Sequence, residues 1–312
     1  MKHLYYSFLF VTLAAFFSCS STEDDDASGF DDGRRVYHLT VADDADATRA
    51  DDGLTRALLF DEGNTLSATW EKDDRLTYCN ISRIYYDVSH NMEYPTQGNL
   101  AALSNSTTSQ FAGDVICKTT DYLALAYPST TFDYETADAA SYVISLEGQD
   151  GSLSTLARSF NYQYGVAEVI SADPDANMAN AKLAMMKSLL TVCRFSFVDA
   201  ESNQAIMVKT LEIEYGGDGS DKNTYPQTAA VITSTDSSTV HASAIDSNKP
   251  LTIDVTPAAE EVYVSLLPTG LRRIFRFTVT SHDGHTYSGT FRATLNEGEC
   301  VMANGLPLSN SN

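Results

Sequence analysis

The sequence predicts an all-β protein, on three observations. Short runs of Val, Ile, Thr, Tyr and Phe recur along the chain between clusters of Gly, Asn, Asp and Ser, as in folds of many short strands. No long stretch spaces its apolar residues as a helix does. The hydrophobic fraction of 43% can build cores, and 312 residues are enough for two domains of ordinary size.

The first predicted strand is an alternating run of six residues, Val36, Tyr37, His38, Leu39, Thr40 and Val41. The acidic segment 42–53 follows and contains Arg49, with Arg56 just beyond it. We expect a trypsin-like protease to cut at either arginine, because exposed polar linkers are the usual sites of proteolysis. A cut there would detach the strand, and the sheet would then expose unpaired backbone beside an apolar groove.

The N-terminal segment predicts export. A short basic start and the apolar run Leu4–Phe17 form a secretory leader over residues 1–18, too short to span a bilayer comfortably. Cys19 follows, which predicts a lipoprotein whose cysteine carries acyl chains such as palmitate; an ordinary secretory leader is the alternative. The acidic residues that open segment 19–35 predict a solvated tether.

Charge and cysteine usage exclude several classes of protein. The formal net charge of −22 repels nucleic acid and anionic lipid headgroups, so no nucleic-acid partner is expected. Cys79, Cys117, Cys193 and Cys300 are widely spaced and form no Cys-x-x-Cys pair. We expect buried free thiols, although an exported protein could form up to two disulfides, whose pairing the sequence does not give.

Other local patterns predict particular elements. Residues 91–109 are rich in Asn, Ser and Thr and predict a surface loop. The apolar spacing in Ala181–Leu190 predicts one short helix. The sequence Asp283-Gly284 between two alternating runs predicts a hairpin with a two-residue type I′ turn. Further strands are predicted at 66–70, 75–81, 114–118, 122–127, 142–146, 167–170, 192–198, 206–215, 251–255, 262–267 and 274–280.

Catalytic and metal-binding motifs are missing from the sequence. His282 and His285 flank the predicted hairpin turn, but no further ligands are indicated near them, so we expect no metal site. The acidic clusters lack the spacing of an EF-hand, which leaves at most weak surface calcium binding. Neither a Gly-x-Ser-x-Gly elbow nor His-Glu-x-x-His occurs. We therefore expect no enzyme activity and no cofactor, although paired glycosidase carboxylates would leave no local motif.

The ordered set of short pieces along the chain resembles the fimbrillin family, the FimA/Mfa-like pilus subunits of anaerobic Gram-negative bacteria. The resemblance covers nearly all of the mature chain. The matching pieces are Thr48-Arg49-Ala50, Leu66–Trp70 with Asp73–Leu76, Phe111–Asp114, Tyr122–Pro128, Leu183–Phe197, Val262–Pro268 and Gly284–Tyr287.

This resemblance implies two tandem transthyretin-like β-sandwich domains, 36–178 and 179–312, with the boundary in the polar stretch near residue 178. It implies export as a lipoprotein, lipid-anchored in the outer membrane and displayed at the cell surface in a fimbrium. Cleavage after Arg49, or second after Arg56, would remove the first strand. A strand from another fimbrial subunit would fill the groove by β-augmentation.

The C-terminal tail departs from what a donor strand needs. Residues 300–308 contain Asn304-Gly305 and Pro307, and proline removes a backbone donor. The tail therefore leaves room for an anchor, tip or accessory subunit beside a polymerising stalk. The expected function is a subunit or accessory protein of surface fimbriae that serves adhesion to a host or bacterial surface ligand. The alternative is a monomeric surface lipoprotein that binds glycans.

Overall fold

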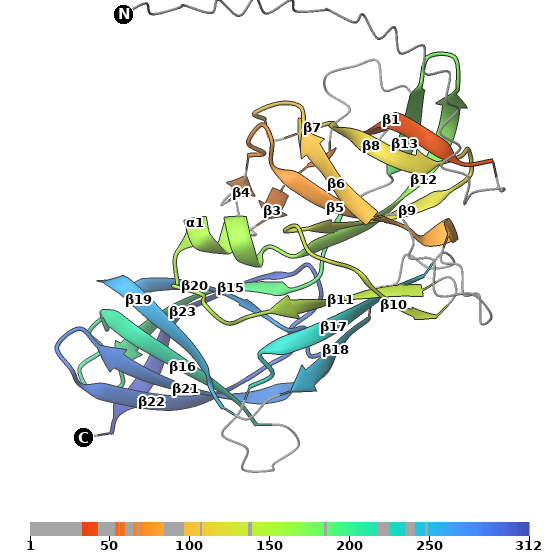
Figure 1. Ribbon diagram of the computed structural model, residues 1–312. Coiled ribbons are helices and arrows are strands. Elements are labelled where there is room, and N and C mark those ends of the chain that lie inside the picture. Colours follow the sequence, from red (N-terminus) through yellow and green to blue (C-terminus); the bar gives the residue numbers. More distant parts are fainter. Residues whose placement is uncertain are drawn as a thin grey trace, which may run out of the picture. The chain divides into compact units, whose positions relative to one another are not determined.

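Strands make up most of the described chain (Figure 1). The computed structural model describes residues 33–42, 54–55, 57–59, 65–67, 69–83, 97–106, 108–136, 139–183, 186–216, 225–234, 241–246 and 249–311. Its strands are β1(Arg35–Ala42), β2(Leu54–Thr55), β3(Ala57–Leu59), β4(Thr65–Ser67), β5(Arg75–Asn80), β6(Gln97–Ala102), β7(Thr108–Ser109), β8(Phe111–Cys117), β9(Tyr122–Tyr127), β10(Asp133–Thr136), β11(Ala139–Ser145), β12(Gln163–Asp173), β13(Met178–Leu183), β14(Lys187–Ser188), β15(Thr191–Asp199), β16(Val208–Gly216), β17(Thr228–Ser234), β18(His241–Asp246), β19(Leu251–Ala259), β20(Glu261–Leu266), β21(Arg273–Ser281), β22(Thr286–Ala293) and β23(Cys300–Asn310). The short helices are η1(Ile81–Arg83), α1(Leu153–Thr155) and η2(Leu156–Phe160).

The first large sheet has eight strands in the order β13-β1-β8-β6-β5-β9-β12-β14. Strand β12 also pairs with β13, so seven of these strands form a closed ring of pairings. The register of β12 shifts between Val169 and Ser171 where it passes from β9 to β13. Such a bulge bends a strand and increases its twist, which allows β12 to pair with β9 along one part and with β13 along the other.

Strand β9 of this sheet is buried on both faces. In β9, Leu123, Leu125 and Tyr127 point into one hydrophobic cluster, whereas Ala124 and Ala126 point into another. Because side chains alternate across a strand, a strand with cores on both sides reads as a continuous apolar run. This explains the sequence Tyr-Leu-Ala-Leu-Ala-Tyr.

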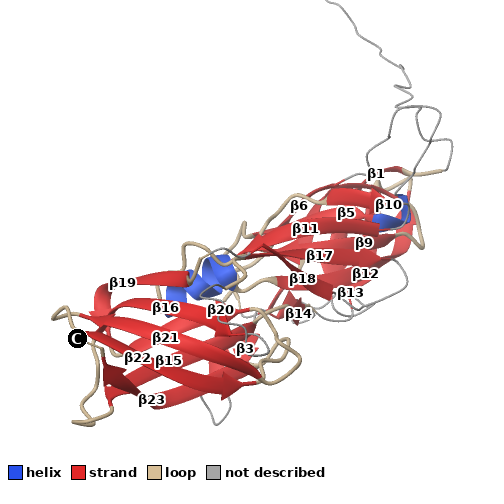
Figure 2. Cartoon of the chain, turned by 90° about the horizontal axis from the view of Figure 1, so that it is seen from below, coloured by secondary structure: helices blue, strands red, loops and turns tan. Residues whose placement is uncertain are grey.

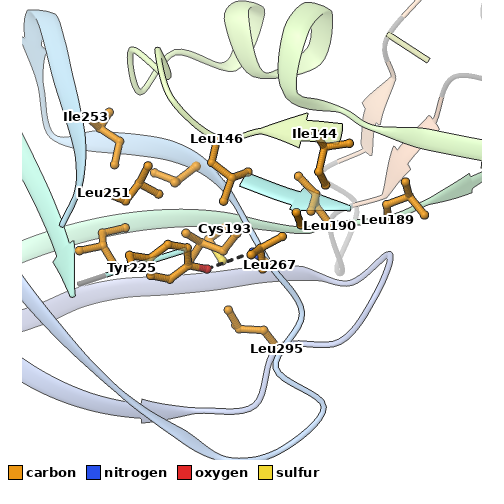
Figure 3. Packing of buried hydrophobic residues seen from close by; sticks show 14 of the residues in the cluster. Ile144, Leu146, Leu189, Leu190, Cys193, Tyr225, Leu251, Ile253, Leu267 and Leu295 are labelled. Atoms are coloured by element: carbon orange, nitrogen blue, oxygen red, sulfur yellow. Dashed lines mark hydrogen bonds between the residues drawn. The ribbon is translucent and has the colours of Figure 1, made fainter. Parts of the chain in front are cut away.

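A four-stranded sheet, β10-β11-β17-β18, joins segments that lie far apart in the sequence. Strand β11 pairs with β17 from Ala139↔Ser234 to Ser145↔Thr228. Ile144 and Leu146 pack in the same cluster as residues from the second half of the chain, including Leu251 and Ile253 (Figure 3). The Tyr225 hydroxyl accepts a hydrogen bond from the Leu267 backbone N–H at 3.0 Å.

The second large sheet has seven strands in the order β19-β16-β21-β22-β23-β15-β20. Its inner face carries aromatic side chains in contact, with the Phe195 and Phe277 ring centroids 5.0 Å apart. Leu156 of η2 packs with Val192 of β15 in a small separate cluster. The all-β prediction with two β-sheet domains is confirmed (Figure 2), one built on each large sheet. The boundary at 178/179 stays a prediction; β13 and β14 pair within the first sheet.

The predicted helix at 181–190 is wrong. Residues 178–183 form β13 and residues 187–188 form β14. Ala179, Ala181 and Leu183 are buried while Met178 is exposed, which is the alternation of a strand. The surface loop predicted at 91–109 is also wrong in part, because residues 97–102 form β6 and bury Leu100.

The hairpin at Asp283-Gly284 is confirmed, but its turn type is not. Strands β21 and β22 pair from Arg273↔Ala293 to Thr280↔Thr286. The Ser281 N–H donates to the His285 carbonyl oxygen at 2.9 Å, so the loop has three residues. Only Gly284 has positive φ, at 89°. A three-residue loop with glycine in this conformation fits a type I turn followed by a bulge.

Candidate functional site

Strand β1 occupies an interior place in the first sheet. It pairs antiparallel with β8 from Arg35↔Cys117 to Val41↔Phe111, and parallel with β13 from His38↔Met178 to Ala42↔Lys182 (Figure 1). Both backbone edges of β1 are therefore used. The sequence pattern correctly predicts this strand, but it does not predict that the strand has neighbours on both sides.

Alternate side chains of β1 enter the first core. Leu39 and Val41 are fully buried and Tyr37 is 5% exposed, whereas Val36 is 51% exposed. The buried side chains share a cluster with Trp70 and Phe111, whose ring centroids lie 4.8 Å apart at nearly a right angle. The slot that holds β1 therefore accepts apolar groups at every second position, whereas His38 is exposed and Thr40 is half-buried.

Apolar burial and backbone hydrogen bonds both contribute to the free energy that holds β1 in the sheet. Complete burial of Leu39 and Val41 contributes about 3–6 kcal/mol together. Each backbone hydrogen bond of the two ladders adds roughly 0.5–1.5 kcal/mol net. Loss of β1 would expose the facing edges of β8 and β13 together with the apolar surface of the cluster.

Polar contacts fix the register of β1. The His38 N–H donates to the Asn177 carbonyl oxygen at 3.1 Å, and His38 Nδ1 lies 3.2 Å from Asp114 Oδ1 on β8. This exposed pair contributes little to stability. On the inner side, the Tyr78 hydroxyl donates to the Asp114 carbonyl oxygen at 3.1 Å. Burial, aided by Cys117 and the Asp114 charge, raises the pKa of Tyr78 to about 12, so this donor stays protonated.

Gly113 allows β8 to lie close to β6 beside the slot. It pairs with Leu39, and a Cβ at this position would lie 2.8 Å from the Asn99 carbonyl oxygen. The neighbouring backbone would have to move to admit any side chain. The glycine therefore keeps β8 in place, with β1 on one side and β6 on the other.

Several predicted site residues lie outside the described residues. They are the leader 1–18, the lipidation candidate Cys19, and both cleavage candidates, Arg49 and Arg56. The six residues of the detachable strand, Val36 to Val41, are all described and all lie in β1. Detachment of that strand and the position of the cut stay predictions.

The parallel partner of β1 was missed from the sequence, because residues 181–190 were interpreted as a helix. The detectable signal is the alternation of small or apolar residues at 179, 181 and 183 with Met178, Asn180 and Lys182. Asn177, which immediately precedes this strand, has φ of 53° and ends the turn from β12. It also accepts the hydrogen bond from His38.

The C-terminal tail forms strand β23, which continues through Asn304-Gly305 and Pro307, the residues expected to interrupt it. It pairs parallel with β15 from Val192↔Cys300 to Asp199↔Leu308, and the register shifts between Phe195 and Phe197. Gly305 there has φ of 61°. The Asn304-Gly305 step is thus a bulge inside the strand.

A pocket lined by both polar and apolar groups lies at the hairpin end of the second domain. It has a volume of about 280 Å³, and its lining includes Asp199, Gln204, Met207, Asp283 and Tyr287. A hydrogen bond from the Glu201 N–H lowers the pKa of Asp199. A hydrogen bond from the Ser281 hydroxyl lowers the pKa of Asp283. Two ionised carboxylates beside an amide and a phenol can accept hydrogen bonds from hydroxyl groups.

The described cysteines form no disulfide, and the metal-ligating side chains of the described residues do not cluster. Cys79, Cys117, Cys193 and Cys300 are free thiols; the first three are buried, as predicted. Burial raises the pKa of Cys193 well above its usual range. Among the residues that the structure describes, no group of three or more His, Cys, Asp or Glu side chains gathers to hold a metal ion. No helix within that part of the chain is long and apolar enough to cross a membrane.

Comparisons with known proteins found distant structural similarity alone. The chain matches no protein-family model and no curated protein. It is similar to the crystal structure of a candidate cell adhesion protein from Bacteroides uniformis, with 11% identity over 90% of this chain and 97% of that one, at a TM-score of 0.49. A candidate cell adhesion protein from Bacteroides ovatus gives 12% identity, coverage of 89% and 97%, and a TM-score of 0.46. The shaft pilin SpaA from Lactobacillus rhamnosus GG gives 10% identity over 89% of this chain and 100% of that one, at a TM-score of 0.35. At these values the function has to be argued from this chain's own residues.

Proposed function

We propose that this protein is a structural or accessory subunit of surface fimbriae that assembles by strand exchange and serves cell adhesion. The observation that carries the proposal is the position of β1. The strand is close to the N-terminus, fills a slot between β8 and β13, and contributes Leu39 and Val41 to a core. A strand in this position can leave without unthreading the rest of the chain.

Cleavage explains why exchange would occur only after maturation. While β1 is tethered through residues 43–53, its effective concentration at the slot is on the order of millimolar or higher, so a strand from another molecule competes poorly. A cut after Arg49 or Arg56 converts β1 into a separate peptide that dissociates and is diluted. The open slot then binds a strand from a neighbouring subunit by backbone pairing, and its alternate pockets set the register.

Export and anchoring complete the proposal. Cys19 would carry the acyl chains that hold the precursor at the outer membrane, and several chains would make that anchoring stable. Because β1 lies between Cys19 and the cleavage candidates, one cut would release the anchor and open the slot together. The net charge of −22 suits an exposed, soluble surface.

The test uses purified precursor, a trace of trypsin and electrophoresis without boiling. We expect a ladder of oligomers, with a released fragment ending at Arg49 or Arg56 identified by mass spectrometry. The matched control is the double variant Arg49→Gln/Arg56→Gln, which should keep β1 and stay monomeric. Release of β1 with no oligomer, or oligomers that form equally in the double variant, would refute strand exchange.

Glycan binding is a second candidate function, favoured by the pocket that Asp199, Asp283 and Tyr287 line. Carboxylates, an amide and an aromatic side chain are the groups that bind sugar hydroxyls and sugar faces. Binding of a polysaccharide that the Asp199→Asn/Asp283→Asn variant loses would support it. A monomer that binds polysaccharide and forms no ladder after cleavage would replace the first proposal.

A further inference from the structure

A seam opens between β22 and β23 in the second domain. The two strands pair only at Tyr287↔Asn310 and Ser288↔Ser309. Gly289 follows, and a Cβ on it would lie 2.6 Å from Leu308 Cδ2, so the strands are in close contact at this point. Among the described residues, no pairing joins the remainder of β22 to β23. The strands therefore separate from Thr290 onward.

The separation leaves an apolar cavity of about 210 Å³ in the side of the sandwich. Phe291 and Ala293 line it from β22, and Val301, Ala303 and Leu306 line it from β23. These five side chains are only partly buried although they pack against the main core. Phe277 lies at the inner side, with its ring centroid 5.5 Å from that of Phe291.

The size and lining of the cavity define an apolar ligand group. An apolar cavity of about 150 Å³ lined by aliphatic and aromatic side chains binds benzene and excludes water. A cavity of about 210 Å³ has room for a group slightly larger than benzene. A bound alkyl chain of this size would cover the half-exposed side chains and gain the free energy of apolar burial.

The charge at the rim defines the other end of the ligand. Arg292 lines the cavity and is exposed. It has no hydrogen-bond or ion-pair partner within the part of the chain that the structure describes. Arg272 precedes the neighbouring strand β21 and Arg273 begins it, and Ile274 of that strand pairs with Arg292. This local group of guanidinium ions stands out in a chain of net charge −22, and screening limits the influence of distant carboxylates to about 8–10 Å.

We infer that the seam between β22 and β23 binds a medium-chain amphiphilic anion, with its alkyl chain in the cavity and its carboxylate on Arg292. Arginine matches a carboxylate with two parallel hydrogen bonds, whereas an uncharged headgroup leaves it in solvent. This site is independent of strand exchange, because β1 and its slot belong to the other β-sheet domain. The two proposals can therefore fail separately.

The test is calorimetric titration of the purified full chain with sodium octanoate. We expect saturable binding with one site, and tighter binding than that of 1-octanol. Arg292→Gln should weaken octanoate binding about fivefold, equivalent to about 1 kcal/mol for an exposed ion pair, and leave 1-octanol unchanged. Arg276→Gln is the matched control, because it removes the same charge from β21 without changing the cavity lining.

A second variant tests the cavity itself. Ala303→Phe places a ring in the cavity and should abolish octanoate binding, with folding checked by circular dichroism. Arg292 is exposed, so its variant keeps the test valid even if Ala303→Phe fails to fold. Burial of an alkyl chain predicts a dissociation constant well below about 5 mM. Absence of saturable binding up to about that octanoate concentration would therefore overturn the inference. Equal octanoate binding by Arg292→Gln and the unmodified chain would also overturn it.

Discussion

Replacement of Leu39 by alanine probes the slot most directly. Leu39 is fully buried in the first core, between Gly113 of β8 and Ala179 of β13. Removal of a buried leucine side chain costs the lost apolar burial plus a cavity term, about 2–5 kcal/mol in all. We expect about 3 kcal/mol here, because the paired strands on both sides limit how far the cavity can collapse.

Trp70 gives a specific assay for this change. It is the only tryptophan of the chain, is fully buried, and lies in the same cluster as Leu39. Its ring contacts Phe111, which pairs with Val41 of β1. Urea unfolding followed by Trp70 fluorescence therefore reports on the core around β1. With a slope of about 2 kcal/mol per molar urea, a loss of 3 kcal/mol lowers the midpoint by about 1.5 M.

The control lies on the same strand. His38 is exposed, and its pair with Asp114 is solvated on both sides. His38→Ala should change the free energy of unfolding by less than about 1 kcal/mol. If Leu39→Ala also costs less than about 1 kcal/mol, β1 is not held in a buried slot and the reasoning fails.

Three further outcomes follow from the described geometry. Gly113→Ala should destabilise the chain by about 1–3 kcal/mol in the same urea assay, since its Cβ meets the backbone of β6; an unchanged midpoint would show that β6 moves freely. Burial raises the pKa of Cys193, and burial followed by the Glu299 charge raises that of Cys300 to about 11, so at pH 8 neither thiol should react with iodoacetamide until urea is added. Because a hydrogen bond from Ser281 lowers the pKa of Asp283, its carboxylate stabilises the hairpin above the unfolded pKa of about 3.9, and this contribution is lost as pH falls through the lower folded value. Melting temperatures measured between pH 5 and pH 2.5 should therefore depend less on pH in Asp283→Asn; equal slopes would contradict the hydrogen bond.

Local patterning predicts those parts of the fold in which one face is buried and the other is solvated. Strand β1 and the β21–β22 hairpin both alternate apolar and polar side chains, and both were predicted. The helix prediction for residues 181–190 was wrong because the apolar residues that follow β13 imitate helical spacing. These residues are Met185, Met186, Leu189 and Leu190. Pairing with β1 and β12 determines that residues 178–183 form a strand, and their short alternation of buried and exposed side chains does not reveal which strands they pair with.

The hairpin turn shows a finer limit. Asp283-Gly284 was correctly interpreted as a turn, but the loop length depends on which residues close the ladder. The Ser281 hydroxyl accepts a hydrogen bond from the His285 N–H at 3.1 Å, which favours closure one residue earlier on that side. A local sequence pattern locates the turn without fixing such a side-chain contact.

The sequence predicts the strand of the candidate site but not the slot that holds it. The alternation of Val36–Val41 identifies the strand and which side chains it buries. The two-sided slot depends on Gly113 and on β13, which come from segments about 75 and 140 residues further along the chain and meet β1 only in the folded sheet. The seam at Arg292 could not be predicted, because it arises where strands β22 and β23 fail to pair along their full length, and the tail that forms β23 was not interpreted as a strand.

Hydrogen–deuterium exchange of the cleaved chain tests the central claim most directly. After a cut at Arg49 or Arg56, we expect residues 36–41 to leave and the amides of β8 and β13 to exchange rapidly in the monomer. Those amides should become protected again when subunits associate. Continued protection of β8 and β13 in a monomer that has lost residues 36–41 would contradict the account.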